Sequence, residues 1–220
     1  MRESTSRTGG IFTVVLGAGL ARRMGRQKLL LPMPDGRPIL RATIDAACGT
    51  SAAGVLLVIG EDGEKLAEAV AGAPVTVLRN PRASEGQSTS LHVAVAALIH
   101  LRASAGVFML ADQPEISPES LQAVMQSYEE SRAPIVQAQY RDGFGHPVLF
   151  SSDLYDALLT VVGDAGGRRV IRDHQHLRHA VAVGGLTPPD IDTPDDYAAL
   201  LARWAERGAS FLEGKDASGR

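Results

Sequence analysis

A glycine-rich turn followed by a cluster of cations is the part of the sequence best suited to chemistry. An apolar run from Ile11 to Leu16 has the composition of a strand and ends at Gly17-Ala18-Gly19. Small residues let a backbone approach a ligand closely, and consecutive amides in such a turn form an anion-binding concavity. Arginine and lysine add charge and hydrogen-bond donors that suit phosphate oxygens. We therefore predict a nucleotide-phosphate site here, with four cations close behind the turn: Arg22, Arg23, Arg26 and Lys28.

Two common phosphate-binding loops do not match this stretch. The dinucleotide-binding fingerprint needs a third glycine where the chain has Arg22, which disfavours an NAD-dependent dehydrogenase. The Walker A loop needs Gly-Lys-Ser or Gly-Lys-Thr, but Gly25 is followed by Arg26. The remaining alternative is an ordinary turn with solvated arginines, and the density of cations argues against it.

Asp112 is a candidate metal ligand because it directly follows the apolar run from Gly106 to Ala111. A carboxylate at the carboxyl end of a central parallel strand is well placed for a divalent cation beside a triphosphate. The alternative is a turn residue or a helix cap. The next helix has its own start at Ser117 and Pro118, so it does not need Asp112 as a cap.

A second acidic cluster precedes the predicted closing helix. Thr193 is expected to cap that helix, with Pro194 at its first position. Asp190 and Asp192 come before the cap and have no such explanation. They are therefore further candidates for function.

The polar segment from Asn80 to Ser90 lies between a strand and a long predicted helix. Unpaired amides at the start of a helix can bind anions. Simple capping by Ser88 or Ser90 explains the same pattern.

The surrounding elements alternate between strands and helices. Apolar runs at 54–59, 75–78 and 106–111 predict buried strands, and helical periodicity covers 38–48, 61–70, 88–102 and 119–132. This order predicts a parallel sheet with right-handed crossovers. Two strands near 134–140 and 147–150, joined by a turn, interrupt the alternation. Short helices at 152–160 and 168–176, a strand at 181–183 and the closing helix complete the prediction.

Several motifs resemble one family, the small nucleotidyltransferases that complete the molybdenum cofactor. LGAGLARRMGRQKLLLP resembles the family signature LAAGxSxRMGxxKLLLP, with departures at Gly17 and Ala21. EGQSTSL resembles EGMSxSL with Gln87 in place of methionine, and MLADQP resembles LLGDQP. GHPVLF, GDAGGR and DIDTPDDY resemble GHPxxF, GDxGAR and DIDTPEDL.

The resemblance implies a Rossmann-like three-layer α/β sandwich of the nucleotide-diphospho-sugar transferase type, its central sheet mostly parallel and covered by helices on both faces. It implies transfer of CMP from CTP to molybdopterin-bound molybdenum, assisted by Mg²⁺. GTP as the donor is one alternative, and a non-catalytic cofactor chaperone for a molybdenum hydroxylase is another. The implied catalytic residues are Lys28, Arg23 and Asp112; the metal ligands Asp112 and Asp192; the acceptor-binding residues His146 and Arg168; and the nucleotide-binding residues Leu16, Gly17, Ala18, Gly19, Arg23, Lys28, Gly86, Ser88 and Ser90.

Composition sets the remaining expectations. The chain has 220 residues, 45% of them hydrophobic, and a net charge of −3, which disfavours a nucleic-acid-binding surface. A single cysteine and the lack of a long apolar segment or signal-like start predict a cytoplasmic protein without membrane contact. We expect one domain over 11–207, with its acceptor-binding part at about 134–190, and disordered tails at 1–10 and 208–220.

Overall fold

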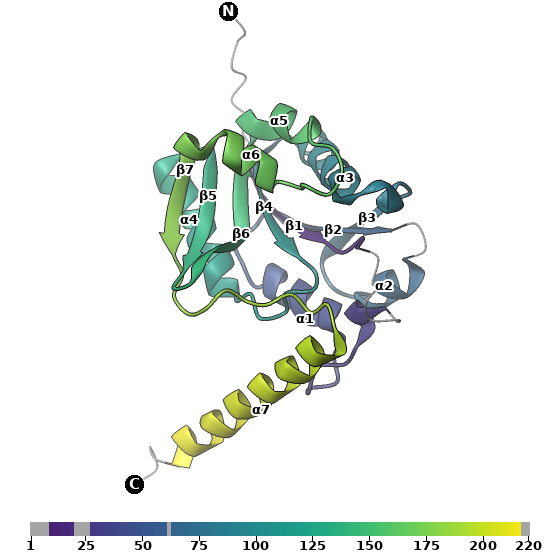
Figure 1. Ribbon diagram of the computed structural model, residues 1–220, viewed down its shortest axis with the longest axis vertical. Coiled ribbons are helices and arrows are strands. Elements are labelled where there is room, and N and C mark those ends of the chain that lie inside the picture. The colour runs from purple at the N-terminus through teal and green to yellow at the C-terminus, as the bar shows by residue number, and fades with distance from the viewer. Residues whose placement is uncertain (1–8, 20–26, 61–62, 217–220) are drawn as a thin grey trace, which may run out of the picture.

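A seven-stranded sheet organises the molecule, which the computed structural model describes over residues 9–19, 27–60 and 63–216 (Figure 1). Its strand order is β3-β2-β1-β4-β6-β5-β7. Only the pairings of β6 with β4 and with β5 are antiparallel, so the predicted mostly parallel sheet is confirmed. The strands are β1 (Gly9–Leu16), β2 (Gly54–Gly60), β3 (Val75–Asn80), β4 (Ala103–Leu110), β5 (Ile135–Tyr140), β6 (Gly143–Ser151) and β7 (Arg178–Ala182).

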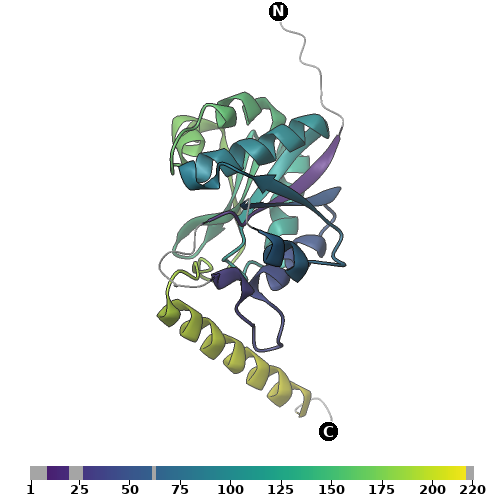
Figure 2. The same cartoon turned by 90° about the vertical axis from the view of Figure 1, so that its right-hand side faces the viewer.

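Helices cover both faces of this sheet, as Figures 1 and 2 show. One face packs against α1 (Ile39–Cys48), α2 (Glu64–Ala69), α4 (Pro118–Ser131) and the start of α7 (Pro194–Asp216). The other face packs against α3 (Gln87–His100), α5 (Tyr155–Leu159) and α6 (Arg168–Asp173). The chain therefore forms the three-layer sandwich that the sequence predicts. None of the described helices is long and apolar enough to cross a membrane.

The central strands are hydrophobic throughout because both of their faces are buried. In β1, Val14 and Val15 are both inaccessible to solvent, yet they belong to the separate apolar clusters on opposite faces of the sheet. Successive side chains in a strand point to opposite faces, so neighbouring apolar residues contribute to two cores at once.

The sheet has a topological switch point beside β1. This strand lies between β2 and β4 and is parallel to both, so the chain leaves it towards β2 and later returns on its other side to form β4. The loops that follow β1 and β4 diverge there, and such a crevice at the carboxyl ends of parallel strands is where ligands bind in open α/β sheets. The predicted phosphate turn and Asp112 belong to these two loops.

Some element boundaries differ from the sequence prediction. β1 begins at Gly9, inside the predicted tail of residues 1–10, because it pairs with Ala103 of β4. β6 begins at Gly143 rather than near Pro147, and β7 begins at Arg178, where it pairs with β5. Helix α7 continues to Asp216, past the point at which the sequence analysis ends the domain. Tertiary pairing sets the strand ends, and local composition does not reveal it.

Candidate active site

A cavity of about 510 Å³, here called the donor cavity, lies at the carboxyl ends of β1 and β4. The turn after β1 forms one wall, held by a hydrogen bond from the Gly17 amide to the carbonyl of Val58 at 2.8 Å. The structure brings eight of the predicted site residues together at this cavity. Predicted residues that line it are Leu16, Gly17, Ala18, Gly19, Lys28, Gly86, Ser90 and Asp112.

The remaining predicted nucleotide-binding residues are Ser88 and Arg23. Ser88 is buried and is not part of the cavity wall, and its amide donates to the carbonyl of Gly163 at 3.0 Å. Arg23 lies outside the described residues. The roles predicted for Arg23 and Ser88 therefore both stay predictions.

Neither serine caps helix α3. Its N-cap is Gly86, which has φ of 123°, a backbone conformation that side chains strongly disfavour. Ser90 instead accepts a hydrogen bond from the side-chain amide of Asn80 at 2.9 Å. Asn80 is almost fully buried, so this bond ties the end of β3 to the wall of the donor cavity.

A charged triad of Lys28, Asp112 and Asp192 lies at the wall of the donor cavity. The ammonium Nζ of Lys28 donates to Oδ2 of Asp112 at 2.6 Å and to Oδ1 of Asp192 at 2.8 Å. The side chains of Lys28, Asp112 and Asp192 are 11%, 19% and 32% exposed, so water screens their charges only in part. The two predicted metal ligands therefore lie on the same side of the molecule and face one cation.

Each member of the triad is positioned by a different part of the chain. Lys28 begins a single 3-10 turn, and Asp112 follows β4. The amide of Ile191 donates to the carbonyl of Asp112 at 3.1 Å, which holds the segment before α7 against the end of the strand. Thr193 caps α7 as predicted: its hydroxyl accepts from the amide of Asp196 at 3.2 Å, and Asp196 accepts in return from Thr193.

The electrostatics of the triad follow from this geometry. Burial alone would lower the pKa of Lys28, but the charge of Asp112 and the hydrogen bonds to both carboxylates raise it overall. Lys28 is therefore fully charged at neutral pH. Burial, and then the negative charges of Asp112 and Asp192, raise the pKa of the adjacent Asp190. Among the described residues, the triad and Asp190 therefore place three carboxyl groups around one ammonium, which favours a further cation.

The donor set fits Mg²⁺ or a similar hard divalent cation. Carboxylate oxygens are its preferred protein ligands, and Asp112 and Asp192 already share one cation. Among the described residues there is no group of three or more acidic, histidine or cysteine side chains arranged to hold a metal ion. An ion held by these two carboxylates would therefore take its other ligands from water and phosphate, as Mg²⁺ commonly does.

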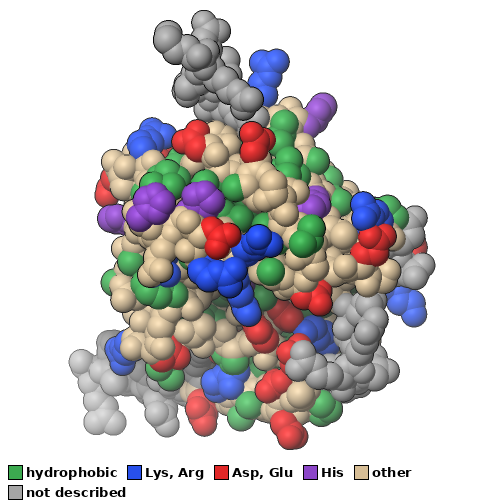
Figure 3. Space-filling view, turned by 45° about the horizontal axis from the view of Figure 1, so that its top comes forward, with side chains coloured by type: hydrophobic (Ala, Val, Ile, Leu, Met, Phe, Trp, Pro, Cys, Tyr) green, Lys and Arg blue, Asp and Glu red, His purple; other side chains and the backbone are tan. Residues whose placement is uncertain are grey.

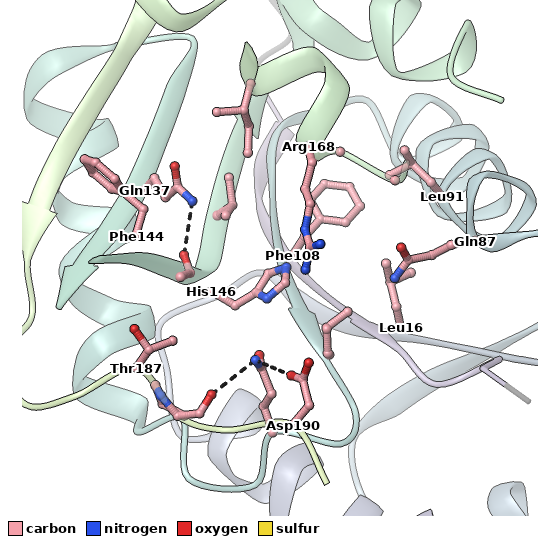
Figure 4. Close-up of a pocket in the computed structure, with 18 of the residues that line it drawn as sticks. Leu16, Gln87, Leu91, Phe108, Gln137, Phe144, His146, Arg168, Thr187 and Asp190 are labelled. Atoms are coloured by element: carbon pink, nitrogen blue, oxygen red, sulfur yellow. Dashed lines mark hydrogen bonds between the residues drawn. The ribbon is translucent and has the colours of Figure 1, made fainter. Parts of the chain in front are cut away.

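A second cavity of about 340 Å³, here called the acceptor cavity, adjoins the first (Figure 4). Both predicted acceptor-binding residues, His146 and Arg168, line it, and Figure 4 shows their side chains side by side. Burial, and then the charge of Arg168, lower the pKa of His146 to about 4. The imidazole is therefore neutral at physiological pH, and Arg168 supplies the positive charge at this point.

The two cavities meet at Gln87. The residues that line both are Leu16, Gln87 and Leu110, and Gln87 is the polar one among them. The loop before α6 supports this residue, because Asp164 Oδ1 accepts a hydrogen bond from the backbone amide of Gln87 at 3.2 Å. Gln87 was not predicted to have a role. The sequence signal that could have drawn attention to it is that the resembling family has methionine at this position.

Gln113 and Asp190 are further site residues that the sequence analysis did not assign to a cavity. Gln113 is 6% exposed, and its Nε2 donates to Oδ1 of Asp190 at 2.7 Å and to the carbonyl of Pro188 at 3.3 Å, the two dashed bonds that meet near Asp190 in Figure 4. Both residues line the acceptor cavity. Their bond links the loop after β4 to the segment before α7, so it also helps to position Asp112 and Asp192.

These features are those of a nucleotide-binding α/β protein, with two adjoining cavities at the carboxyl ends of its central strands. Residues 13–179 match the MobA-like NTP transferase domain, and the chain belongs to that family. It is a nucleotidyltransferase of the MobA-like type rather than a dehydrogenase, in agreement with the sequence analysis.

Comparison with individual proteins supports this assignment. The chain is 31% identical to the purine catabolism protein PucB of Bacillus subtilis, over 85% of this chain and 94% of that protein. It is 26% identical to the molybdenum cofactor cytidylyltransferase of Escherichia coli, over 89% of this chain and 98% of that protein. The crystal structure of Rv0371c from Mycobacterium tuberculosis is 34% identical, with a TM-score of 0.77 over 88% of this chain and 98% of that one. Rv0371c has also been crystallised in complex with manganese.

Proposed function

We propose that this protein transfers a cytidylyl group from CTP to the phosphate of a molybdopterin-type acceptor and releases pyrophosphate. The observation that carries the proposal is the position of Lys28 between Asp112 and Asp192, at the wall of the donor cavity. A glycine turn, Lys28 and Asp112 line one cavity, and Asp192 contacts the same lysine; together they provide what a triphosphate and its divalent cation need.

The chain's own residues act mainly by positioning and by neutralising charge. The amides of Ala18 and Gly19 donate to phosphate oxygens of the donor, beside the Gly17 amide that is bonded to Val58, and Lys28 donates to the same phosphates. Arg168 attracts the anionic acceptor into the adjoining cavity. Holding both substrates in line removes much of the entropic barrier, and fixed positive charge stabilises the transition state of phosphoryl chemistry.

The transfer itself is a balanced displacement. An oxygen of the acceptor phosphate forms a bond to the α-phosphorus of the donor while the bond from that phosphorus to the bridging oxygen breaks. Pyrophosphate leaves with the bonding electrons. A phosphate monoester is already an anion near neutral pH, so no general base is required. A divalent cation on Asp112 and Asp192 would neutralise negative charge on the phosphates and orient them.

Lys28 and a divalent cation would share the same two carboxylates. The ammonium lies within 2.8 Å of one oxygen of each, so a cation held by Asp112 and Asp192 would compete with it. The phosphates of the donor would offer Lys28 a replacement anion.

The choice of CTP and of the acceptor is supported by the Escherichia coli cytidylyltransferase and by the segments EGQSTSL, GHPVLF and DIDTPDDY. The cytoplasm is the proposed location, and a molybdenum hydroxylase is the proposed recipient of the product. GTP as donor and a purely carrying role are the competing outcomes that the experiment must separate.

Pyrophosphate release tests the proposal. Purified protein is mixed with Mg²⁺, molybdopterin-bound molybdenum and, in separate reactions, CTP, GTP or ATP. We expect fast release with CTP, at least tenfold slower release with the purines, and none without the acceptor. Fast release with GTP would assign the guanylyl reaction, and no release with any nucleotide would assign a carrier.

A further inference from the structure

A positively charged groove continues outward from the acceptor cavity. It has a volume of about 330 Å³ and is here called the arginine groove. Gln137, Phe144, Arg168 and Ile171 line both the groove and the acceptor cavity, so the two spaces are continuous. The residues that line the groove are Gln137, Phe144, Arg168, Ile171, Arg172, Gln175 and Arg178.

Three guanidinium groups converge on this groove without an acidic residue in its lining. Arg168 and Arg172 are one turn apart on α6, and Arg178 comes from β7 at the edge of the sheet. Like charges at this helical spacing repel each other. Figure 3 shows Lys and Arg side chains gathered at the centre of the corresponding face. An anion in the groove would relieve this repulsion.

Asp173, which pairs with arginines of α6, leaves most of this charge unbalanced. Asp173 lies 3.5 Å from both Arg172 and Arg169, and all three side chains are about half exposed or more. Exposed ion pairs of this kind are weak. Neither Arg168 nor Arg178 has a carboxylate partner among the described residues, so the groove keeps a net positive charge.

Phe144 and Gln137 fix one of the three cations in place. The guanidinium of Arg178 lies over the ring of Phe144, 3.9 Å from its centroid, and donates a long bond of 3.4 Å to Oε1 of Gln137. Phe144 is itself 41% exposed and lines the groove, so part of its ring faces the open space. A stacked guanidinium keeps its edge free to donate two parallel hydrogen bonds to an oxyanion.

We propose that the arginine groove binds an oxyanion of the acceptor other than the phosphate that reacts. This inference rests on the proposed function, because it takes the acceptor cavity to hold the acceptor. The reacting phosphate then lies at Gln87, where the cavities meet, and the second anionic group enters the groove past Arg168 and Phe144, which line both spaces. The acceptor thus carries two anionic groups, and an oxo-metal group such as bound molybdate has the required chemistry.

Binding of inorganic molybdate tests the groove without any turnover. Calorimetric titration compares the unaltered protein with Arg172→Gln, Arg178→Gln and the double variant. The matched control is Arg169→Gln, which removes a neighbouring cation of the same helix that does not line the groove. We expect at least tenfold weaker binding in the double variant and no change in the control, with thermal melting confirming that each variant is folded. Equal binding in the double variant and the control would overturn the proposal.

Steady-state kinetics then connect the groove to the acceptor. We expect the double variant to raise the KM for molybdopterin-bound molybdenum at least tenfold, with the KM for CTP and the turnover number little changed. Molybdate binding that depends on the arginines, combined with an unchanged acceptor KM, would show a site for free oxyanions and would contradict the proposal. If no nucleotide is transferred at all, the proposed function fails, whereas the titration still decides whether the groove binds an oxyanion.

Discussion

Lys28 and Asp192 are separated by 164 positions in the sequence, yet the ammonium of one lies 2.8 Å from a carboxylate oxygen of the other. Asp112, which follows the central strand β4, contacts the same ammonium at 2.6 Å. A single cation therefore joins three segments that are remote in sequence. A divalent ion held by the same two carboxylates would compete with this ammonium, and the first two predictions test that competition.

Replacing Lys28 by methionine should lower turnover at least 100-fold, because loss of one donor to a developing phosphate charge typically costs about 10²–10³ in rate. The same variant should bind Mn²⁺ more tightly without nucleotide, since the competing ammonium is gone. Pyrophosphate release and a calorimetric Mn²⁺ titration measure the two effects. Near-normal turnover in this variant would contradict the assigned role of Lys28.

Asp112→Asn and Asp192→Asn should each lower turnover about 100-fold and raise the Mg²⁺ concentration needed for half-maximal rate. Asp195→Asn is the matched control, because Asp195 is an exposed residue of the first turn of α7, next to the site in sequence. We expect the control to keep the Mg²⁺ dependence of the unaltered protein. An equal shift in all three variants would show that the effect is not specific to the triad.

Gln87→Glu should lower kcat about tenfold to 100-fold, since it adds a carboxylate where two anionic substrates meet. Gln87→Met has a similar volume and restores the residue of the resembling family, so it separates charge from shape. We expect a much smaller loss in the methionine variant. Matching losses in both variants would show that repulsion is not the cause.

His146 should make stability depend on pH. The pKa of a histidine side chain is ordinarily 6.5, and in the folded protein that of His146 is about 4, so the unfolded chain binds the extra proton between these values. The stabilisation by neutral His146 is complete above pH 6.5 and is lost as the pH falls towards 4. The linkage relation gives a loss of about 2 kcal/mol between about pH 7.5 and pH 5.

Urea unfolding of the unaltered protein and of His146→Gln at both pH values measures this contribution. We expect the glutamine variant to lose about 2 kcal/mol less than the unaltered protein over the same interval, because its side chain does not titrate. An identical loss in both proteins would show that other groups account for the pH dependence.

The ion pair between Arg203 and Glu115 should contribute to stability. The side chain of Glu115 is only 4% exposed, and Arg203 of α7 donates to its Oε2 at 2.7 and 2.9 Å. Arg203→Met should lower the free energy of unfolding by about 2–4 kcal/mol, because it leaves a buried carboxylate with fewer partners. Combining it with Glu115→Gln should recover part of this loss in urea unfolding. The explanation would be contradicted if the double variant lost more free energy of unfolding than the two single variants lose together.

Much of the fold could be predicted from the sequence because its signals are local. The apolar run of β2 and the helical periodicity of α4 each identify an element that the structure contains. Glycine at position 86 could not be distinguished from a neighbouring serine as the cap of α3, because the deciding quantity is its positive φ. Strand ends such as Gly9 were missed since they depend on pairing with a distant partner.

The candidate site was partly predictable for a related reason. Asp112 and Lys28 occur in motifs whose residue types indicate phosphate chemistry, and the structure brings them together. Ser88 has the right type and spacing, but it is buried where α3 meets the loop at Gly163. Gln113 and Gln87 were missed because a glutamine becomes informative only when its neighbours in space are known.

Asp192 follows all seven strands of the sheet in the sequence, and its backbone neighbour Ile191 is hydrogen-bonded to Asp112 at the tip of β4. During synthesis the chain emerges from its amino-terminal end, so the glycine turn, Lys28 and β4 leave the ribosome before this segment. A nascent chain that has folded its first five strands therefore still lacks one of the two carboxylates. Catalytic competence would thus be withheld until residue 192 is in place, and a product that stops before it would be inert.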